Sequence, residues 1–178
     1  MQNEIVLGGM GGQGVMIIGQ LLAHAALLED MNVVWFPSYG PETRGGTAKC
    51  TIIISDKEIG SPLAPTPDVL VALTQLMLDK ESANVKPGGT IIYNSSLANP
   101  PQRPDCKVIA LKANDLAAEL GNIKTANMVM LGAFIELVDS VKMESIKASL
   151  KEVLPERYHK SIPMNEAALD LGADEIKK

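Results

Sequence analysis

The chain has 178 residues, and its 46% hydrophobic and 21% charged residues are typical of a folded globular protein, so we expect a single domain over residues 1–178. Its formal net charge of -5 and scattered Lys and Arg residues disfavour a general nucleic-acid binder, which needs a cationic stripe. No apolar run approaches the roughly 20 residues that cross a bilayer, and the N-terminus lacks signal-peptide features, so we expect a cytoplasmic protein with no membrane partner.

Short apolar runs rich in Val and Ile and bordered by Gly, Pro or Asn predict strands. They lie at residues 4–8, 32–36, 48–55, 68–73, 90–94 and 107–111. Longer periodic stretches predict helices at residues 13–30, 75–84, 114–120, 126–138, 143–150 and 165–171. This alternation indicates a Rossmann-like, three-layer α/β/α fold with a mostly parallel sheet. Since no helical pattern joins the second and third strands, we expect them to be antiparallel and the sheet to be mixed.

The glycine cluster "GGMGGQGVM" lies between the first expected strand and the first expected helix. Gly9, Gly11 and Gly14 have the GxGxxG spacing that lets a phosphate approach the backbone at a helix start. A full dinucleotide fingerprint also needs an acidic residue after the second strand, and residues 32–40 contain none, which disfavours NAD or FAD. No GK[ST] follows, so a Walker-type site is excluded. A phosphate-binding turn and a purely structural turn remain open.

The next informative stretch, "FPSYGPETRGGT" at residues 36–47, places Tyr39, Glu42 and Arg44 among glycines and prolines. Irregular loops of this kind on a rigid scaffold often carry binding function. Arg44 could bind a phosphate or carboxylate, and Glu42 could accept hydrogen bonds or act on a proton. Alternatively, both belong to a surface turn and pair with each other or with solvent.

The stretch "TANMVMLGAF" begins a helix that is apolar almost all round, which predicts burial on more than one side, in this core or against another subunit. Asn127 is the polar exception near its start, and we expect it to cap the helix or to bond a neighbouring loop.

The cysteines and histidines do not form a catalytic or metal-binding pattern. Cys50 and Cys106 lie far apart in strand-like segments and are expected to be free, and two cysteines cannot supply the four thiolates of an iron–sulfur cluster. His24 and His159 have no second ligand at helical spacing and no motif for nucleophilic catalysis. We therefore assign no catalytic residue and no metal site.

Four segments in this order, "GGMGGQGVM", "SYGPETRGG", "LGNIKTANMVMLGAF" and "IPMNEAALDLG", resemble the gamma subunit of 2-oxoacid:ferredoxin oxidoreductases. The resemblance spans essentially the whole chain. It implies a complex that oxidatively decarboxylates a 2-oxoacid with coenzyme A to give an acyl-CoA, carbon dioxide and reduced ferredoxin. It favours 2-oxoglutarate or 2-ketoisovalerate over pyruvate as the substrate.

The resemblance also implies the roles of individual segments. Gly9, Gly11, Gly12, Gln13 and Gly14 would form the turn, with coenzyme A as a hypothetical ligand. Tyr39, Gly40, Glu42, Arg44 and Gly45 would form a loop facing partner and substrate, to which we add Asn127. Thiamine diphosphate and iron–sulfur clusters are expected on partner subunits, a thiamine-binding chain and a ferredoxin-like chain, with ferredoxin as a partner of the complex.

Two other functions remain as alternatives. A self-sufficient dinucleotide-binding oxidoreductase would contain NAD or flavin when purified. A non-catalytic scaffold subunit would tolerate charge-preserving changes in the loop at residues 36–47 without loss of turnover.

Overall fold

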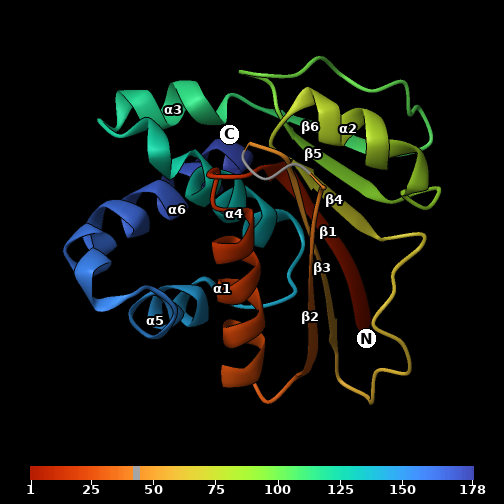
Figure 1. Ribbon diagram of the computed structural model, residues 1–178, viewed down its shortest axis with the longest axis horizontal. Coiled ribbons are helices and arrows are strands. Elements are labelled where there is room, and N and C mark those ends of the chain that lie inside the picture. Colours follow the sequence, from red (N-terminus) through yellow and green to blue (C-terminus); the bar gives the residue numbers. More distant parts are fainter. Residues whose placement is uncertain (42–44) are drawn as a thin grey trace.

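The computed structural model describes residues 1–41 and 45–178, and within them six strands form one sheet in the order β2-β3-β1-β4-β5-β6 (Figure 1). The strands are β1 (Gln2–Met10), β2 (Asn32–Tyr39), β3 (Thr47–Ser55), β4 (Val69–Ala72), β5 (Thr90–Asn94) and β6 (Lys107–Leu111). The α-helices are α1 (Val15–Leu28), α2 (Gln75–Glu81), α3 (Ala113–Glu119), α4 (Ala126–Leu137), α5 (Met143–Val153) and α6 (Ile162–Lys177). Short 3-10 helices are η1 (Ser82–Asn84), η2 (Ile123–Thr125) and η3 (Glu156–Ser161).

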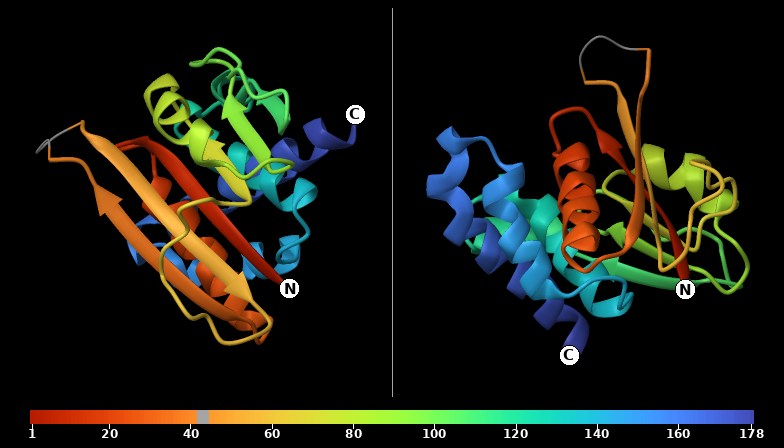
Figure 2. Two further views of the ribbon diagram at one scale, coloured as in Figure 1. Left: turned by 90° about the vertical axis from the view of Figure 1, so that its right-hand side faces the viewer. Right: turned by 90° about the horizontal axis from the view of Figure 1, so that it is seen from below.

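Alternating side chains of the strands enter two different apolar layers. Ile5 and Leu7 of β1 belong to the larger layer, which α1 and α4 complete, with α5 packed on α1 and α6 packed on α4. Val6 faces the opposite side and packs with the smaller layer that includes Leu78 of α2. Helices therefore cover both faces of the sheet, as expected (Figures 1 and 2).

The sheet is mixed, because β1 has a parallel neighbour on one side and an antiparallel neighbour on the other. It pairs parallel with β4 and antiparallel with β3, which in turn pairs antiparallel with β2. The remaining pairs, β4 with β5 and β5 with β6, are parallel. The prediction of a mostly parallel, mixed sheet with antiparallel second and third strands is confirmed.

Some elements are longer than the sequence predicted. Strand β2 continues through Pro37 to Tyr39. The backbone N–H groups of β2 point alternately toward β3 and away from it. Because Gly40 N–H bonds the Thr47 carbonyl, the Pro37 nitrogen points away from β3, toward the unpaired edge of the sheet. The N–H that proline lacks therefore removes no hydrogen bond between strands. Helix α6 begins before the expected position 165 and ends beyond 171. Its early start is compatible with Pro163, which lies in the first turn, where proline is tolerated.

Glycines bring α4 and α6 into direct backbone contact. A Cβ on Gly132 of α4 would overlap the Leu169 carbonyl oxygen, and one on Gly172 of α6 would overlap the Val129 carbonyl oxygen. Helix α4 is buried on nearly all sides, which confirms the prediction for its apolar sequence. Gly172 is therefore a packing residue inside α6 and does not mark the end of the helix.

Arg103 holds the segment between β5 and β6 against η1. Its guanidinium donates to the carbonyl oxygens of Ser82 and Val85, and it forms two hydrogen bonds to the Asp105 carboxylate at 2.8 and 2.9 Å. The hydrogen bonds from Arg103 to the Asp105 carboxylate lower the pKa of Asp105 to about 2. Over the same described residues, no helix is long and apolar enough to cross a membrane.

Candidate functional site

The glycine turn, residues 11–14, joins β1 to α1 at the carboxyl end of β1. Gly12 and Gly14 have left-handed backbone angles, with φ of 93° and 76°, which favour glycine. Gln13 and Met10 lock the turn reciprocally: Gln13 N–H donates to the Met10 carbonyl at 3.1 Å, and Met10 N–H donates to Gln13 Oε1 at 2.7 Å. The turn is thus a fixed backbone structure.

Gly9 does not belong to this turn, in contrast to its expected position. It lies in β1 opposite Ala48 of β3, because the antiparallel ladder continues to Met10. A Cβ on Gly9 would lie 2.7 Å from Gln13 Oε1 and 2.9 Å from Val15 Cγ2. Glycine is needed here because the start of α1 approaches the strand closely.

Within the described residues, the start of α1 presents backbone donors that have no partner. The first helical bond runs from Ile18 N–H to the Gly14 carbonyl at 3.2 Å, so the N–H groups of Val15, Met16 and Ile17 have no helical acceptor. No side chain of residues 1–41 or 45–178 caps this end, and the first turn contains no acidic residue. The site therefore favours an anion.

Asn127 connects α4 to the glycine turn. Its Nδ2 donates to the Gly14 carbonyl at 3.4 Å, its Oδ1 accepts from Met128 N–H at 3.0 Å, and its side chain is 7% exposed. A Cβ on Gly14 would overlap Asn127 Nδ2. The expectation that Asn127 bonds a neighbouring loop is confirmed, although it lies on a helix and not in the loop at residues 36–47.

The β2–β3 hairpin is attached to the same turn. Gly11 N–H donates to the Gly46 carbonyl at 2.8 Å, and Gly40 N–H closes the hairpin on Thr47. The paired ends of these strands project from the body of the molecule (Figure 2), and Tyr39 is 68% exposed there. Gly45 has a left-handed φ of 67°. Glu42 and Arg44 lie outside the described residues.

Two surface cavities flank the glycine turn. One, of about 260 Å³, lies between the turn and the hairpin and includes Tyr39 and Met16. The other, of about 190 Å³, we call the amide pocket; it is lined by Gln13, Leu73, Asn94, Asn114, Ile123, Lys124, Ala126 and Asn127. The structure thus brings the glycine turn, Tyr39 and Asn127 together around one edge of the sheet.

Asn94, Asn114 and Lys124 are pocket residues that the sequence analysis did not identify. Asn94 ends β5, and Asn114 begins the helix after β6, so both lie at carboxyl ends of parallel strands. Ligands of open α/β sheets bind at that edge. In the sequence, Asn94 ends one apolar run and Asn114 follows the next run by three residues, and neither belongs to a local motif.

The sheet order explains why a dinucleotide fingerprint does not fit. The neighbour of β1 on the hairpin side is β3, which runs antiparallel, so its amino end at Thr47 lies beside Met10. On the other side, β4 is followed by Leu73 and Thr74. Neither position supplies the carboxylate that binds a ribose in the Rossmann arrangement.

Both cysteines are free, as expected, and lie away from the turn's unpartnered amides. Cys50 is buried between β3 and α1, and burial raises the pKa of its thiol to about 12. Within residues 1–41 and 45–178, no group of three or more His, Cys, Asp or Glu side chains could hold a metal ion.

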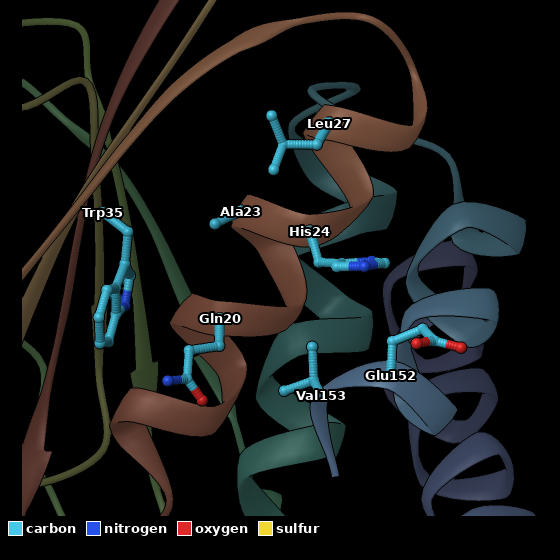
Figure 3. Close-up of a pocket in the computed structure, with 7 residues that line it drawn as sticks. All are labelled: Gln20, Ala23, His24, Leu27, Trp35, Glu152 and Val153. Atoms are coloured by element: carbon cyan, nitrogen blue, oxygen red, sulfur yellow. The ribbon is translucent and has the colours of Figure 1, made fainter.

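His24 points from α1 toward α5, beside a surface groove of about 380 Å³ that also includes Trp35 and Glu152 (Figure 3). Ser149 Oγ donates to the Ser145 carbonyl at 2.7 Å, so it accepts from His24 Nδ1–H at 3.0 Å. His159 Nε2 likewise donates to the Leu154 carbonyl at 2.8 Å. The His24 ring thus links α1 to α5, and the His159 ring bonds the residue that caps the end of α5.

The family model described as pyruvate ferredoxin/flavodoxin oxidoreductase matches residues 4–175. The chain is 37% identical over 176 residues to ketoisovalerate oxidoreductase subunit VorA of Methanothermobacter marburgensis, covering 98% of this chain and 37% of VorA. It is 37% identical over 159 residues to 2-oxoglutarate synthase subunit KorC of Methanocaldococcus jannaschii, covering 87% of this chain and 85% of KorC. The chain thus spans only about 37% of the length of VorA.

Two solved structures have the same fold. The gamma subunit of the keto/oxoacid ferredoxin oxidoreductase from Geobacter sulfurreducens is 32% identical, with a TM-score of 0.83 and 98% of both chains covered. The 2-oxoglutarate:ferredoxin oxidoreductase from Magnetococcus marinus, solved with 2-oxoglutarate, coenzyme A and succinyl-CoA bound, is 24% identical, with a TM-score of 0.87. That match covers 99% of this chain and 31% of the other.

Proposed function

The chain belongs to the pyruvate ferredoxin/flavodoxin oxidoreductase family, and from this premise we propose that it acts as the gamma subunit of a multi-subunit 2-oxoacid:ferredoxin oxidoreductase. The complex would convert a 2-oxoacid, coenzyme A and oxidised ferredoxin into an acyl-CoA, carbon dioxide and reduced ferredoxin. We propose 2-ketoisovalerate or 2-oxoglutarate as the substrate, because the relatives VorA and KorC carry those names. We place the complex in the cytoplasm.

The proposal rests on one observation: at the carboxyl end of β1, the glycine turn presents backbone amides that no described residue accepts. The N–H groups of Val15, Met16 and Ile17 point out of the helix end, and the cavity beside them opens to solvent. Backbone donors at a helix start bind phosphate without a charged side chain. We propose that they bind the diphosphate of coenzyme A, a compound that the related Magnetococcus marinus enzyme binds.

Exposed apolar side chains around this edge support the proposal that another subunit covers it. Tyr39, Leu76, Leu97 and Ile123 are all large and exposed, and each follows the carboxyl end of a strand or lines one of the two cavities. Large apolar side chains left exposed at one end of a sheet make that end a candidate protein interface. We propose that the thiamine-binding and ferredoxin-like subunits contact these apolar side chains, beside the coenzyme A site on this chain.

The described residues support a binding role for this chain and give no reason to assign it a catalytic group. Cys50 is buried with a raised pKa, and both histidines form hydrogen bonds within the chain. Thiamine diphosphate and iron–sulfur clusters would be carried by the partner subunits. We therefore propose that the isolated chain is catalytically silent.

Purification of the tagged full chain from its native host tests this function. The expected result is co-purification with larger chains that contain thiamine diphosphate and iron, and turnover only in that complex. Purification of the chain alone with bound NAD or flavin, or turnover by the isolated chain, would overturn the proposal.

A further inference from the structure

The amide pocket beside the glycine turn has an unusual polar lining. Four of its side chains are carboxamides, those of Gln13, Asn94, Asn114 and Asn127, and Lys124 adds an ammonium group. Among the described residues that line it, none is acidic. A carboxamide both donates and accepts hydrogen bonds, so the pocket's preference depends on which atoms are already used.

Every carboxamide oxygen in this lining already accepts a hydrogen bond from the protein. Asn94 Oδ1 accepts from Ser96 N–H at 3.3 Å, and Asn114 Oδ1 accepts from Asn94 Nδ2 at 2.7 Å. Gln13 Oε1 and Asn127 Oδ1 accept from the backbone N–H groups of Met10 and Met128. Because each partner is an N–H donor, the orientation of each amide is fixed.

The nitrogens of these amides divide into two groups. Asn94 Nδ2 donates to Asn114 and to the Leu73 carbonyl, and Asn127 Nδ2 donates to the Gly14 carbonyl. Within the described part of the chain, Gln13 Nε2 and Asn114 Nδ2 have no acceptor. With Lys124, the pocket therefore offers donors with no acceptor among the described residues, whereas each of its carboxamide oxygens already accepts one hydrogen bond.

We propose that the amide pocket binds an oxyanion, a phosphate monoester or a carboxylate, through Gln13 Nε2, Asn114 Nδ2 and the Lys124 ammonium. Such groups accept hydrogen bonds without donating any in return, which matches the fixed donors of the lining. This inference rests on the proposed function, because Gln13 also belongs to the glycine turn. The pocket thus adds a second anion subsite next to the proposed diphosphate site.

Two ligands of the proposed reaction carry a suitable group: coenzyme A has a 3′-phosphate, and the 2-oxoacid has a carboxylate. Titration of the ¹⁵N-labelled full chain with coenzyme A, dephospho-coenzyme A and 2-oxoglutarate separates them. Coenzyme A but not dephospho-coenzyme A should shift the Gln13 and Asn114 side-chain NH2 signals if the phosphate is bound. A shift with 2-oxoglutarate alone identifies the carboxylate.

Asn114→Asp tests the donor directly, because an aspartate still accepts from Asn94 Nδ2 but presents an oxygen in place of Nδ2. We expect it to weaken binding of the responding ligand at least tenfold. Asn32→Asp, on exposed edge strand β2, makes the same charge change far from the pocket and should leave affinity unchanged. Equal affinities of the two variants, or no shift of the Asn114 signal with any of the three ligands, would overturn the inference.

The proposed coenzyme A site can fail separately in the same titration. If the Asn114 side chain responds to an oxyanion while the backbone amides of Val15 and Met16 respond neither to coenzyme A nor to dephospho-coenzyme A, the pocket stands and the diphosphate site is wrong. If those backbone amides respond and the Asn114 side chain does not, the diphosphate site stands and the pocket assignment is wrong.

Discussion

The substitution Gly12→Ala should show whether the glycine turn binds phosphate or has only a structural role. Gly12 has φ of 93°, and a Cβ there would meet no atom within 4 Å. Gly88 has φ of 79° and equally open surroundings, but it precedes β5, at the amino end of that strand and away from the glycine turn. An L-residue in this conformation costs about 1–2 kcal/mol, so Gly12→Ala and Gly88→Ala should lose similar stability.

The two variants should differ in coenzyme A binding. The Gly12 methyl group would stand in the open space where a phosphate approaches the turn, whereas the Gly88 methyl group would not. Loss of hydrogen bonds to a charged group costs about 1.5–3 kcal/mol. This range corresponds to an increase of roughly 10- to 100-fold in the KM for coenzyme A.

The assay is steady-state turnover of the reconstituted complex, with the KM for coenzyme A and for the 2-oxoacid measured separately, and with thermal unfolding of each variant chain. We expect Gly12→Ala to raise only the KM for coenzyme A and Gly88→Ala to change neither KM. Equal KM values for coenzyme A in the two variants, at equal stability, would refute phosphate binding at this turn.

Three further predictions concern the fold. Gly132→Ala should lower the free energy of unfolding by about 3 kcal/mol, measured in urea, because its Cβ would overlap the backbone of α6. Iodoacetamide at pH 8 should alkylate Cys106 much faster than Cys50, measured by mass spectrometry, because burial raises the pKa of Cys50 to about 12. Asp105→Asn should make the free energy of unfolding fall less steeply as the pH is lowered. Folding lowers the pKa of Asp105 from 3.8 to about 2. Its ion pair therefore stabilises the folded chain fully above about pH 4, and this stabilisation is lost toward pH 2.

Each of these has a control within the chain. Gly60→Ala, at an exposed loop position with open space around its Cβ, should leave stability nearly unchanged. Unfolding in denaturant should make both thiols react at similar rates, and unequal rates in the unfolded chain would remove burial as the cause. Asp79→Asn, at an exposed position of α2, should leave the acid limb of the stability curve as steep as in the unchanged chain.

The sequence predicted best those elements whose signal is local. Strands β5 and β6 were predicted at their observed bounds, because each is a short apolar run with clear borders. The extension of β2 through Pro37 could not be predicted, since it depends on the strand lying at the sheet's edge. Likewise, the predicted C-terminal helix stopped at residue 171, and the packing role of Gly172 inside α6 depends on α4, which lies against it.

The candidate site likewise contains residues that a local motif predicted and residues that only the fold brings together. Gly11, Gln13 and Gly14 were identified because one short motif contains them. Asn94, Asn114 and Lys124 come from segments that only the sheet order brings together, so no spacing along the chain could group them. The direction of their hydrogen bonds, which makes the pocket a set of donors, depends on backbone positions that only the folded chain defines.

As a proposed subunit of a 2-oxoacid:ferredoxin oxidoreductase, this chain should be required for turnover of the complex. The most direct measurement is ferredoxin reduction by the partner subunits, with and without the chain, across a panel of 2-oxoacids in the presence of coenzyme A. We expect turnover only when the chain is present, with 2-ketoisovalerate or 2-oxoglutarate preferred over pyruvate. Full turnover by the partner subunits without the chain would contradict it.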